Sequence, residues 1–385
     1  MARKTNLVII GAGPFGLALA AYATHLGIEH LIVGQPMEFW KRNMPQGMYL
    51  RSASDWHLDP VGVHTIEQFS QMQRLIVADV EPLSLEFYLS YAEWFQKQKR
   101  IAPLPLFIRQ LDHAAKDHHF LATTAEDEII CAQNVVIAPG FKPFAHLPSE
   151  LTTRFPASRI SHTCDLVDFT SLKGKRCLIV GGRQSAFEWA ALLIEAGAAA
   201  VHLTHRHDSP AFKASDWSWV NPLVDAMVEN PNWFRRLSQE EKDAISQRLW
   251  AEGRLKVEPW LEPRLLNDCV MLWPRTEVLD CRERVDGEMA VRLSNGETLI
   301  IDHIILATGY KVKIERLPFL VAGNILKKLA MRNGFPILDD HFQTNVSGLF
   351  ITSMPATQDF GPFFAFTIGV RASAKLIGQA LQAAQ

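Results

Sequence analysis

Two stretches of the chain carry the same pattern of hydrophobic and polar positions. Each begins with four apolar residues in a row, continues into a glycine-containing turn, and passes into an alanine- and leucine-rich run with helical spacing: Leu7–Leu26 and Cys177–Ala198. A short uninterrupted apolar run is typical of a strand buried on both faces. A second apolar run follows each helix, at Leu31–Val33 and Val201–Thr204. The pattern therefore predicts two β-α-β units in one α/β chain.

The first turn reads GAGPFG, which has the spacing of a phosphate-binding turn. Gly11 permits the tight bend, Gly13 lets the backbone approach a pyrophosphate, and Gly16 lets the helix pack close to the strand. The start of the following helix offers free N–H groups and the positive end of its dipole. A glycine turn also arises by chance, but its place between a strand and a helix favours dinucleotide binding. The residues expected to bind the cofactor here are Gly11, Gly13, Pro14, Phe15 and Gly16.

The strand after this helix ends LIVGQP, where many dinucleotide-binding folds place an acid that binds the adenosine ribose. Gly34 and Gln35 stand at that place instead. The charged acceptor is missing, although Gln35 still offers a hydrogen-bonding group to a hydroxyl. We therefore keep Gln35 as a cofactor-binding candidate.

Residues 39–54 form a predicted loop that is rich in large apolar side chains. The large apolar side chains of Trp40 and Met48 are expected to be buried against a flat apolar surface. The loop either fills the core or wraps an isoalloxazine ring, and composition alone does not separate these two interpretations. Arg51 and Ser52 are its polar candidates for contact with phosphate or flavin oxygens.

The second glycine turn, GGRQSA, departs from the first at one position. Gly181 provides the bend, but Arg183 takes the place of the second glycine. Its Cβ is expected to crowd a phosphate, whereas its guanidinium is a good phosphate ligand. Gln184 and Ser185 complete the candidate nucleotide site. The following strand ends in a basic turn at Arg206, which favours the 2′-phosphate of NADPH, with a solvated basic turn as the alternative.

Three further segments contain small residues that let a backbone pass close to a bound dinucleotide. Two are strands, VVIAPG and DHIILATGY, and the third is DFGPFF, which begins a predicted helix over Gln358–Gly378. The free N–H groups at such a helix start would face a flavin. The cofactor-binding candidates in these segments are Gly140, Thr308, Gly309, Tyr310, Asp359, Gly361 and Pro362.

Residues 209–253 are rich in tryptophan and read as largely helical, with a capping box at Ser238–Glu241. Inserted between the strands of a nucleotide fold, this segment either lines a substrate pocket or forms a packing or dimer surface. Asp216 and Asn221 are its substrate-pocket candidates. The catalytic residues are otherwise unknown at this stage.

Composition limits the partners. The chain has 385 residues and a formal net charge of −2, so no basic surplus indicates nucleic acid. No apolar run reaches membrane-spanning length. The first strand starts close to Met1, so we expect no signal peptide and a cytoplasmic location.

The five cysteines are scattered and contain no CxxC pair. This argues against a disulfide framework, a structural zinc and a redox-active dithiol, and we expect buried, reduced thiols. His57 and His64 have no partner at metal-ligand spacing, so we expect both at the surface and no metal site.

Across nearly its whole length the chain resembles the two-dinucleotide-binding flavoproteins. Within that class it is similar to the NADPH-dependent flavin monooxygenases of the lysine/ornithine N-hydroxylase type. Asp302–Tyr310 matches their D-x3-L-ATGY motif, Gln184–Glu188 resembles their NADPH turn, and Trp40 with Met48 resembles their flavin-covering loop. The resemblance implies FAD and NADPH as cofactors and O2 with a small molecule as substrates. It also places Asn221 near the amino-acid substrate, although Pro222 replaces the glutamate usual there.

These observations predict two Rossmann-like dinucleotide-binding domains, with the NADP domain inserted in a discontinuous FAD domain. The expected boundaries are 1–165 and 311–385 for the FAD domain and 166–310 for the NAD(P) domain, with the helical insertion near 209–253. The predicted function is an FAD-dependent monooxygenase that uses NADPH and O2 to oxygenate a small substrate, at an amine nitrogen. An NAD(P)H-dependent flavin oxidoreductase without oxygen insertion and a non-enzymatic flavin- or nucleotide-binding protein remain as alternatives. A homo-oligomer is left open.

Overall fold

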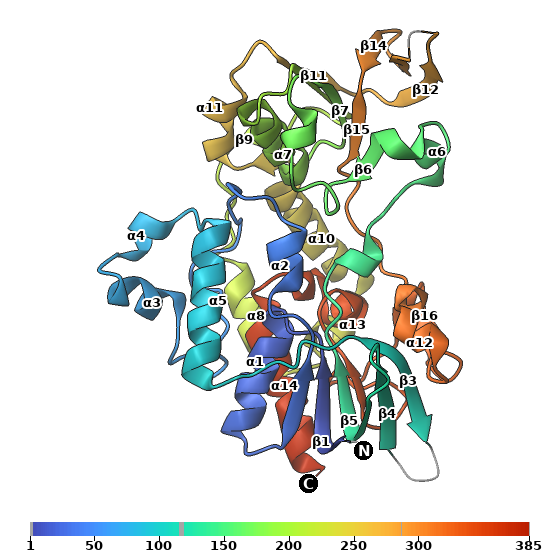
Figure 1. Cartoon of the computed structure of the whole chain (residues 1–385). Helices are drawn as coiled ribbons and strands as arrows, with labels where there is room; N and C mark the ends of the chain where they lie inside the picture. The colour runs from blue at the N-terminus through green and yellow to red at the C-terminus, as the bar shows by residue number, and fades with distance from the viewer. Residues whose placement is uncertain (1–2, 115–118, 286, 385) are drawn as a thin grey trace.

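The computed structural model describes residues 3–114, 119–285 and 287–384. Figure 1 shows two lobes, each built on its own sheet, with both chain ends at the lower lobe. The lower lobe holds the beginning and the end of the chain, whereas the middle of the chain forms the upper lobe. We call them the first and second lobes.

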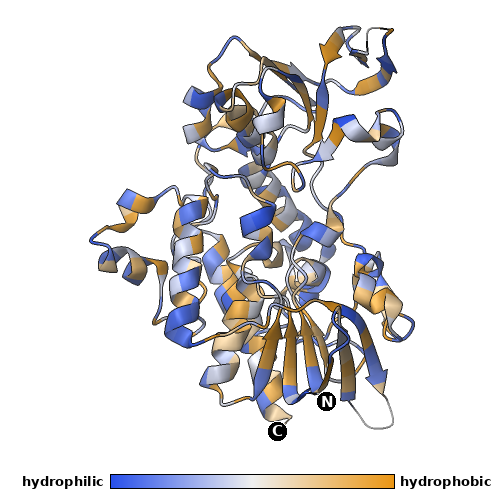
Figure 2. Ribbon diagram, in the orientation of Figure 1, coloured by the Kyte–Doolittle hydropathy of each residue, from blue (hydrophilic) through white to orange (hydrophobic). Residues whose placement is uncertain are grey.

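The first lobe is organised around a six-stranded sheet in the order β2-β1-β5-β4-β3, with β18 also paired to β5. The strands β1, β2, β5 and β18 are parallel, and β3 and β4 form an antiparallel extension. Figure 2 shows the central strands as strongly hydrophobic, as expected for a sheet covered on both faces. The strand bounds are β1 Arg3–Ile10, β2 His30–Val33, β3 Ile108–Ala114, β4 His119–Thr124, β5 Ile129–Ile137 and β18 Leu349–Ile351.

Two helices from opposite ends of the chain pack together in this lobe: α1 (Pro14–His25) and α14 (Gly369–Ala383). Both bury a face rich in alanine and leucine in the main hydrophobic core. The first lobe is thus assembled from segments that the second lobe separates in the sequence, as the sequence predicted.

The second lobe contains an all-parallel sheet in the order β11-β8-β7-β15-β6. A three-stranded antiparallel sheet, β12-β13-β14, follows β11 and includes the predicted hairpin at Asn295–Gly296. The bounds are β6 Ile160–His162, β7 Arg176–Val180, β8 Ala200–His205, β11 Val270–Pro274, β12 Val278–Glu283, β13 Met289–Leu293, β14 Thr298–Ile301 and β15 His303–Leu306. The helix α7 (Gln184–Glu195) crosses between β7 and β8.

The tryptophan-rich insertion is helical and lies between the lobes near the middle of Figure 1. It comprises α8 (Val220–Glu229), α9 (Trp233–Arg236) and α10 (Gln239–Gly253). The predicted capping box is present, because Ser238 and Glu241 each accept from the other's backbone N–H. In the first lobe, α8 contacts α14 and α9 contacts α13 (Thr357–Phe360).

The remaining elements are short, apart from α5, which covers one side of the first lobe. Their bounds are α2 Glu38–Arg42, α3 Ile66–Met72, α4 Val77–Val80, α5 Leu85–Lys99, α6 Ser149–Thr152, α11 Glu262–Leu265, α12 Pro318–Ala322, β9 Ala211–Phe212, β10 Lys256–Val257, β16 Met331–Arg332 and β17 Phe335–Pro336. Across the described ranges, no helix is both long and apolar enough to cross a membrane.

One predicted element was wrong in its continuity. The single helix expected over Gln358–Gly378 is three pieces: α13, a 3-10 turn at Pro362–Ala365, and α14 from Gly369. Gly361, with φ of 96°, and Pro362 end the first piece, because neither continues an α-helix in that setting.

Candidate active site

The two glycine turns are built in the same way. Gly11 and Gly181 have φ of 112° and 148°. A Cβ on Gly11 would lie 2.2 Å from the carbonyl oxygen of Ala138, and one on Gly181 would lie 2.5 Å from that of Ala307. In each lobe the residue directly after the neighbouring strand is therefore an alanine whose carbonyl lies close against the glycine turn. The two turns are structural equivalents, which the repeated sequence pattern predicted.

The first turn leaves room for an anionic group. A Cβ on Gly16 would lie 1.8 Å from the oxygen of Gly11, so this glycine serves close packing of helix on strand. A Cβ on Gly13 would meet nothing within 4 Å, and no side chain caps α1. The N-terminal N–H groups of α1 thus face open space, which fits the pyrophosphate of a dinucleotide. Pro14 and Phe15 are buried and contribute packing.

At Gly34, where the ribose of the dinucleotide is expected, the backbone conformation disfavours a side chain. Gly34 has φ of 131°, and its Cβ would lie 3.1 Å from the peptide nitrogen of Ala12. A side chain at this position would be strained, so the acid of other dinucleotide folds is absent for a local steric reason. Gln35 follows it and is partly exposed, so it stays a predicted ribose ligand.

The second turn differs because Arg183 contacts the insertion and Gln184 contacts the segment that follows it. Arg183 is the N-cap residue of α7, and its guanidinium lies 4.4 Å from the ring centroid of Trp250 in α10. The Gln184 amide donates to Glu188, and its oxygen accepts from the backbone of Glu258. Ser185 is exposed at the start of α7. No local sequence pattern predicted the Trp250 and Glu258 contacts, since both partners come from distant segments.

Arg206, the predicted 2′-phosphate ligand, is exposed beyond the end of β8. Its guanidinium lies 3.8 Å from the Glu277 carboxylate, a loose surface pair. Neighbouring His205 is buried against Gly182, and burial lowers its pKa to about 4, so it is neutral. Arg206 therefore stays the predicted phosphate ligand at this strand end.

The loop expected to cover a flavin joins the two lobes. Trp40 lies in α2 and packs on Tyr88 with ring centroids 4.8 Å apart. Met48 packs against the cores of both lobes. The next residue, Tyr49, donates its backbone N–H to Glu188 of α7 at 3.1 Å. The loop therefore forms a contact between the two lobes, which we call the seam. Its contact with a flavin remains a prediction.

Arg51 uses its donors within the protein. Its Nε donates to Glu258 at 2.8 Å, and its Nη1 donates to the Gly253 carbonyl at 2.9 Å. It therefore ties the loop to the end of α10. Ser52 accepts from the Thr367 hydroxyl at 3.0 Å, which links the loop to the segment before α14. Neither contact was predicted from the sequence.

The ATGY segment lies against an aromatic cluster at the crossing between the lobes. The ring of Tyr310 lies 5.1 Å from that of Phe141 and 5.5 Å from that of His162. His162 Nδ1 accepts from the Cys164 backbone, so its Nε2 carries the proton and donates to the Gly309 carbonyl at 3.1 Å. Burial lowers the pKa of His162, so the imidazole is neutral.

Two other candidates near this crossing have backbone roles. Thr308 donates its hydroxyl to the His146 carbonyl. Gly140 has φ of 66° with no atom near its Cβ position, so it permits a bend with space around it. Both positions remain compatible with a dinucleotide passing close to the backbone.

Asp359 links α13 to the chain segment around Arg332 and Leu338. Its carboxylate is buried and accepts from Arg332 at 3.0 Å and from the Leu338 backbone at 2.9 Å. Gly361 makes room for the insertion, since a Cβ there would lie 3.0 Å from the Phe234 ring of α9. Pro362 starts the 3-10 turn. Direct cofactor contact by these three residues remains a prediction.

The two substrate-pocket candidates are placed differently. Asn221, in the first turn of α8, accepts from the Trp56 indole at 2.8 Å and donates to the Asp55 carboxylate. It therefore joins the insertion to the loop of the first lobe. Asp216 is exposed and accepts from the backbone and hydroxyl of Ser218, as a local turn residue does.

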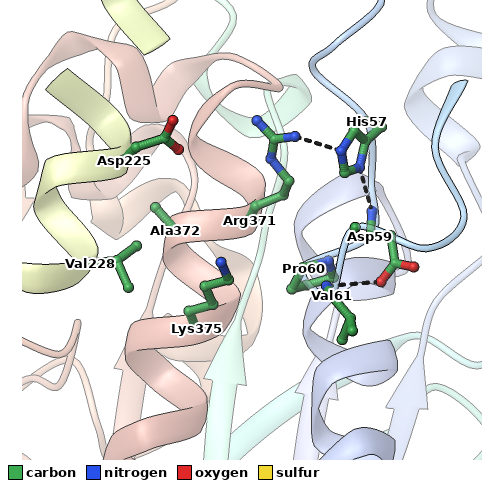
Figure 3. Close-up of a pocket in the computed structure, with 10 residues that line it drawn as sticks. His57, Asp59, Pro60, Val61, Asp225, Val228, Arg371, Ala372 and Lys375 are labelled. Carbon is green, nitrogen blue, oxygen red and sulfur yellow. Dashed lines mark hydrogen bonds between the residues drawn. The ribbon is translucent and has the colours of Figure 1, made fainter. Parts of the chain in front are cut away.

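A pocket of about 260 Å³ lies beside this junction, between α8, α14 and the loop at His57. Figure 3 shows Arg371 reaching from α14 to His57 at 2.6 Å, with Lys375 below it and Asp225 across from it. The expectation of a surface His57 was wrong: burial and the nearby Arg371 charge lower its pKa to about 4. The expectation held in part for His64, which is partly exposed but bonded through its backbone to Asp59.

The cysteines also differ from the expectation of five buried thiols. Cys164 and Cys177 are buried, and burial raises the pKa of the Cys164 thiol to about 11. Cys269 is exposed, and Cys131 and Cys281 are partly exposed. In the part of the chain that the structure describes, no group of three or more His, Cys, Asp or Glu side chains is arranged to hold a metal ion.

The family model for pyridine nucleotide-disulphide oxidoreductases matches residues 8–248, which span both glycine turns. The chain belongs to this family. Both of its equivalent turns lie in the matched region.

One curated relative and two solved structures are similar to this member of the family. It is 26% identical over 218 residues to a 34.2 kDa protein in the rubredoxin operon of Clostridium pasteurianum, covering 54% of this chain and only 57% of that relative. Its fold is that of the ornithine N-hydroxylase of Kutzneria sp. 744, with a TM-score of 0.81 over 99% of each chain at 15% identity. It also matches the bacillithiol disulfide reductase of Staphylococcus aureus, with a TM-score of 0.67 over 100% of this chain and 99% of that one at 18% identity.

The comparisons confirm the fold class, two dinucleotide-binding lobes in one flavoprotein-like architecture. The domain boundaries remain a prediction. The strand β6, which begins at Ile160, lies before the predicted boundary at residue 165 but pairs with β15 in the second sheet.

Proposed function

We propose that the chain is an FAD-dependent monooxygenase that uses NADPH and O2 to oxygenate a small substrate at an amine nitrogen. The observation that carries the proposal is the pair of equivalent glycine turns, Gly11 under Ala138 and Gly181 under Ala307. Two such turns in one chain suit one flavin dinucleotide and one pyridine dinucleotide. The close fold match to an ornithine N-hydroxylase solved with reduced FAD, NADP+ and L-ornithine supports this assignment.

FAD, when bound at the first turn, supplies the redox chemistry that links NADPH to O2. The residues of this chain that would hold it are those around the open start of α1, notably Gly11 and Gly13, with Gln35 toward the ribose. The work of the protein is to bind the two dinucleotides, to orient them and to keep water out, so no acid–base triad is required.

The cysteines favour this proposal over reduction of a disulfide by a protein dithiol. The sequence contains no CxxC pair. Cys164, whose thiol interacts with Tyr310 of the ATGY segment, is buried with a raised pKa, so its thiol is protonated at neutral pH. A thiol in this state is a poor nucleophile.

We place the substrate beside the junction of Asp55, Trp56 and Asn221. This junction joins the tryptophan-rich insertion to Asp55 and Trp56, which directly follow the loop expected to cover the flavin. Asp55 provides a negative charge for an amine, and the tryptophans Trp56 and Trp217, with ring centroids 6.3 Å apart, provide an apolar wall.

The test mixes FAD-loaded protein anaerobically with NADPH and separately with NADH, with and without ornithine and other small amines. We expect NADPH to bleach the flavin absorbance faster than NADH. After oxygen is admitted, mass spectrometry should show an amine that has gained one oxygen atom. No bleaching under any condition would contradict the proposal and favour a non-enzymatic nucleotide-binding role.

Bleaching without oxygen insertion would identify the alternative, an NAD(P)H-dependent flavin oxidoreductase. The fold match to bacillithiol disulfide reductase is the observation that keeps this alternative in place. The cytoplasmic location, the lack of nucleic-acid partners and any homo-oligomer remain predictions.

A further inference from the structure

Two arginines meet the same tryptophan ring above the second glycine turn. The guanidinium carbon of Arg183 lies 4.4 Å from the ring centroid of Trp250, and that of Arg254 lies 5.7 Å from it. Arg183 caps α7 in the second lobe, whereas Trp250 and Arg254 belong to the last turn and C-cap of α10 in the insertion. The ring therefore gathers two cations from separate elements at the start of α7.

Neither guanidinium has a hydrogen-bond or carboxylate partner within the described residues. Nearby arginines do: Arg51 pairs with Glu258, and Arg264 pairs with Glu195. Burial and the Arg51 charge lower the pKa of Arg254, so its cation is held in an unfavourable place. The negative end of the α10 dipole favours the Arg254 cation at this position. The dipole does not, however, provide hydrogen-bond acceptors for the N–H groups of the guanidinium. Two unneutralised cations at one ring indicate an anionic ligand.

We propose that Arg183 and Arg254, held by Trp250, bind the pyrophosphate of the pyridine dinucleotide and fasten the insertion over it. This inference rests on the proposed function, because it requires a pyridine dinucleotide at the second turn. Arg183 stands at the second glycine position of the turn, which in other folds faces the pyrophosphate. In other folds the glycine lets the backbone come close to the pyrophosphate. Arg183 would instead bind it through two parallel N–H groups of its guanidinium, which match the geometry of a phosphate.

The position of the pair selects the pyrophosphate over the 2′-phosphate. Arg183 lies at the N-terminus of α7, where helix N–H groups face phosphate. The 2′-phosphate belongs at the end of β8, where Arg206 is exposed. The pyrophosphate is common to NADH and NADPH, so the two sites differ in a measurable way.

The test measures dissociation constants of NADP+ and NAD+ for the full-length, FAD-loaded protein by calorimetry. Arg183→Gly, which restores the usual glycine, and Arg254→Ala should each weaken both nucleotides by about tenfold or more, because each removes charge-assisted hydrogen bonds. Trp250→Ala should weaken both as well. Arg206→Ala should weaken NADP+ and leave NAD+ unchanged.

Arg248→Ala is the matched control. Arg248 also lies in α10 and stacks on a tryptophan, Trp219, at 4.5 Å, but its charge faces Asp216. This variant should bind both nucleotides as the wild type does. Melting temperatures within a few degrees of wild type would show that each variant is folded.

The outcomes separate the two proposals. If wild type binds neither nucleotide, the proposed function fails. If wild type binds them and Arg183→Gly and Arg254→Ala bind equally well or better, the pyrophosphate clamp is wrong and the glycine turn alone is sufficient. A loss for NADP+ alone would reassign the arginines to the 2′-phosphate and overturn the inference.

Discussion

The backbone N–H of Tyr49 donates to the buried carboxylate of Glu188 across the seam between the two lobes, at 3.1 Å. Tyr49 belongs to the loop expected to cover the flavin, and Glu188 lies one turn into the helix that follows the second glycine turn. Burial raises the pKa of Glu188 to about 7, although the hydrogen bonds from Tyr49 and Gln184 act in the opposite direction. This contact therefore makes the seam sensitive to pH near neutrality.

The first prediction concerns stability against pH. Because the folded-state pKa of Glu188 exceeds its usual 4.5, the folded protein binds the proton more tightly than the unfolded chain does. The stabilisation that protonated Glu188 gives to the folded protein is complete below the pKa of the unfolded chain. It is lost as the pH rises through about 7, the pKa in the folded protein. Wild type should lose on the order of 3 kcal/mol of unfolding free energy from this group between about pH 5 and pH 8. Urea unfolding at several pH values measures this loss.

Glu188→Gln keeps the shape and removes the titration, so its unfolding free energy should change less over the same range. Other groups titrate in both proteins, and the difference between the two curves isolates Glu188. Parallel curves would show that Glu188 stays ionised across the range and that the prediction is incorrect.

The second prediction separates two glycines of one turn. Gly16→Ala places a Cβ 1.8 Å from the Gly11 oxygen, so it should prevent folding or lower the melting temperature strongly. Gly13→Ala meets no atom within 4 Å and should keep the melting temperature of the apoprotein. Its Cβ enters the space expected for the pyrophosphate, so FAD retention should fall. Thermal melts of apoprotein and the flavin content after gel filtration measure the two effects. Normal FAD content in Gly13→Ala would argue against the predicted phosphate site.

The third prediction tests the proposed substrate junction. Asn221→Ala removes the link between Trp56 and Asp55 without touching either glycine turn. We expect a raised KM for the amine and more NADPH consumed per oxygenated product, with an unchanged rate of anaerobic flavin reduction. Asp216→Ala is the control, because the exposed Asp216 side chain accepts from Ser218 and pairs with Arg248, and neither of these residues belongs to the proposed junction. Equal behaviour of the two variants would remove Asn221 from the substrate site.

The fourth prediction concerns Asp359. Asp359→Asn removes a buried carboxylate that holds Arg332 and the Leu338 backbone, so it should cost about 1–3 kcal/mol of unfolding free energy. Glu93→Gln, which breaks only an exposed pair with Lys97, should leave stability unchanged within error. Denaturant titration compares the two variants. If Asp359→Asn were as stable as wild type but lost FAD, Asp359 would be a cofactor ligand rather than a structural residue.

The sequence predicted elements that depend on neighbouring residues. The two strand–turn–helix units, the capping box at Ser238 and the hairpin at Asn295–Gly296 are all present, because apolar spacing and turn chemistry act over a few residues. The split at Gly361 was missed, since a Gly-Pro pair both ends one helix and starts another. The fold class followed from the repeat of the whole unit.

Local patterns were sufficient to predict the two strand–turn–helix units and their two glycine turns, which are built alike in the structure. Tertiary structure alone decided what the charged side chains touch. Arg51 reaches Glu258, Arg183 reaches Trp250 and Tyr49 reaches Glu188 over long separations in the chain. Such pairs form only where packing of the two lobes and the insertion brings distant segments together, and their energies depend on the burial that this packing creates. No local pattern records that burial, so the same arginine can serve as a phosphate ligand or as a tie between helices.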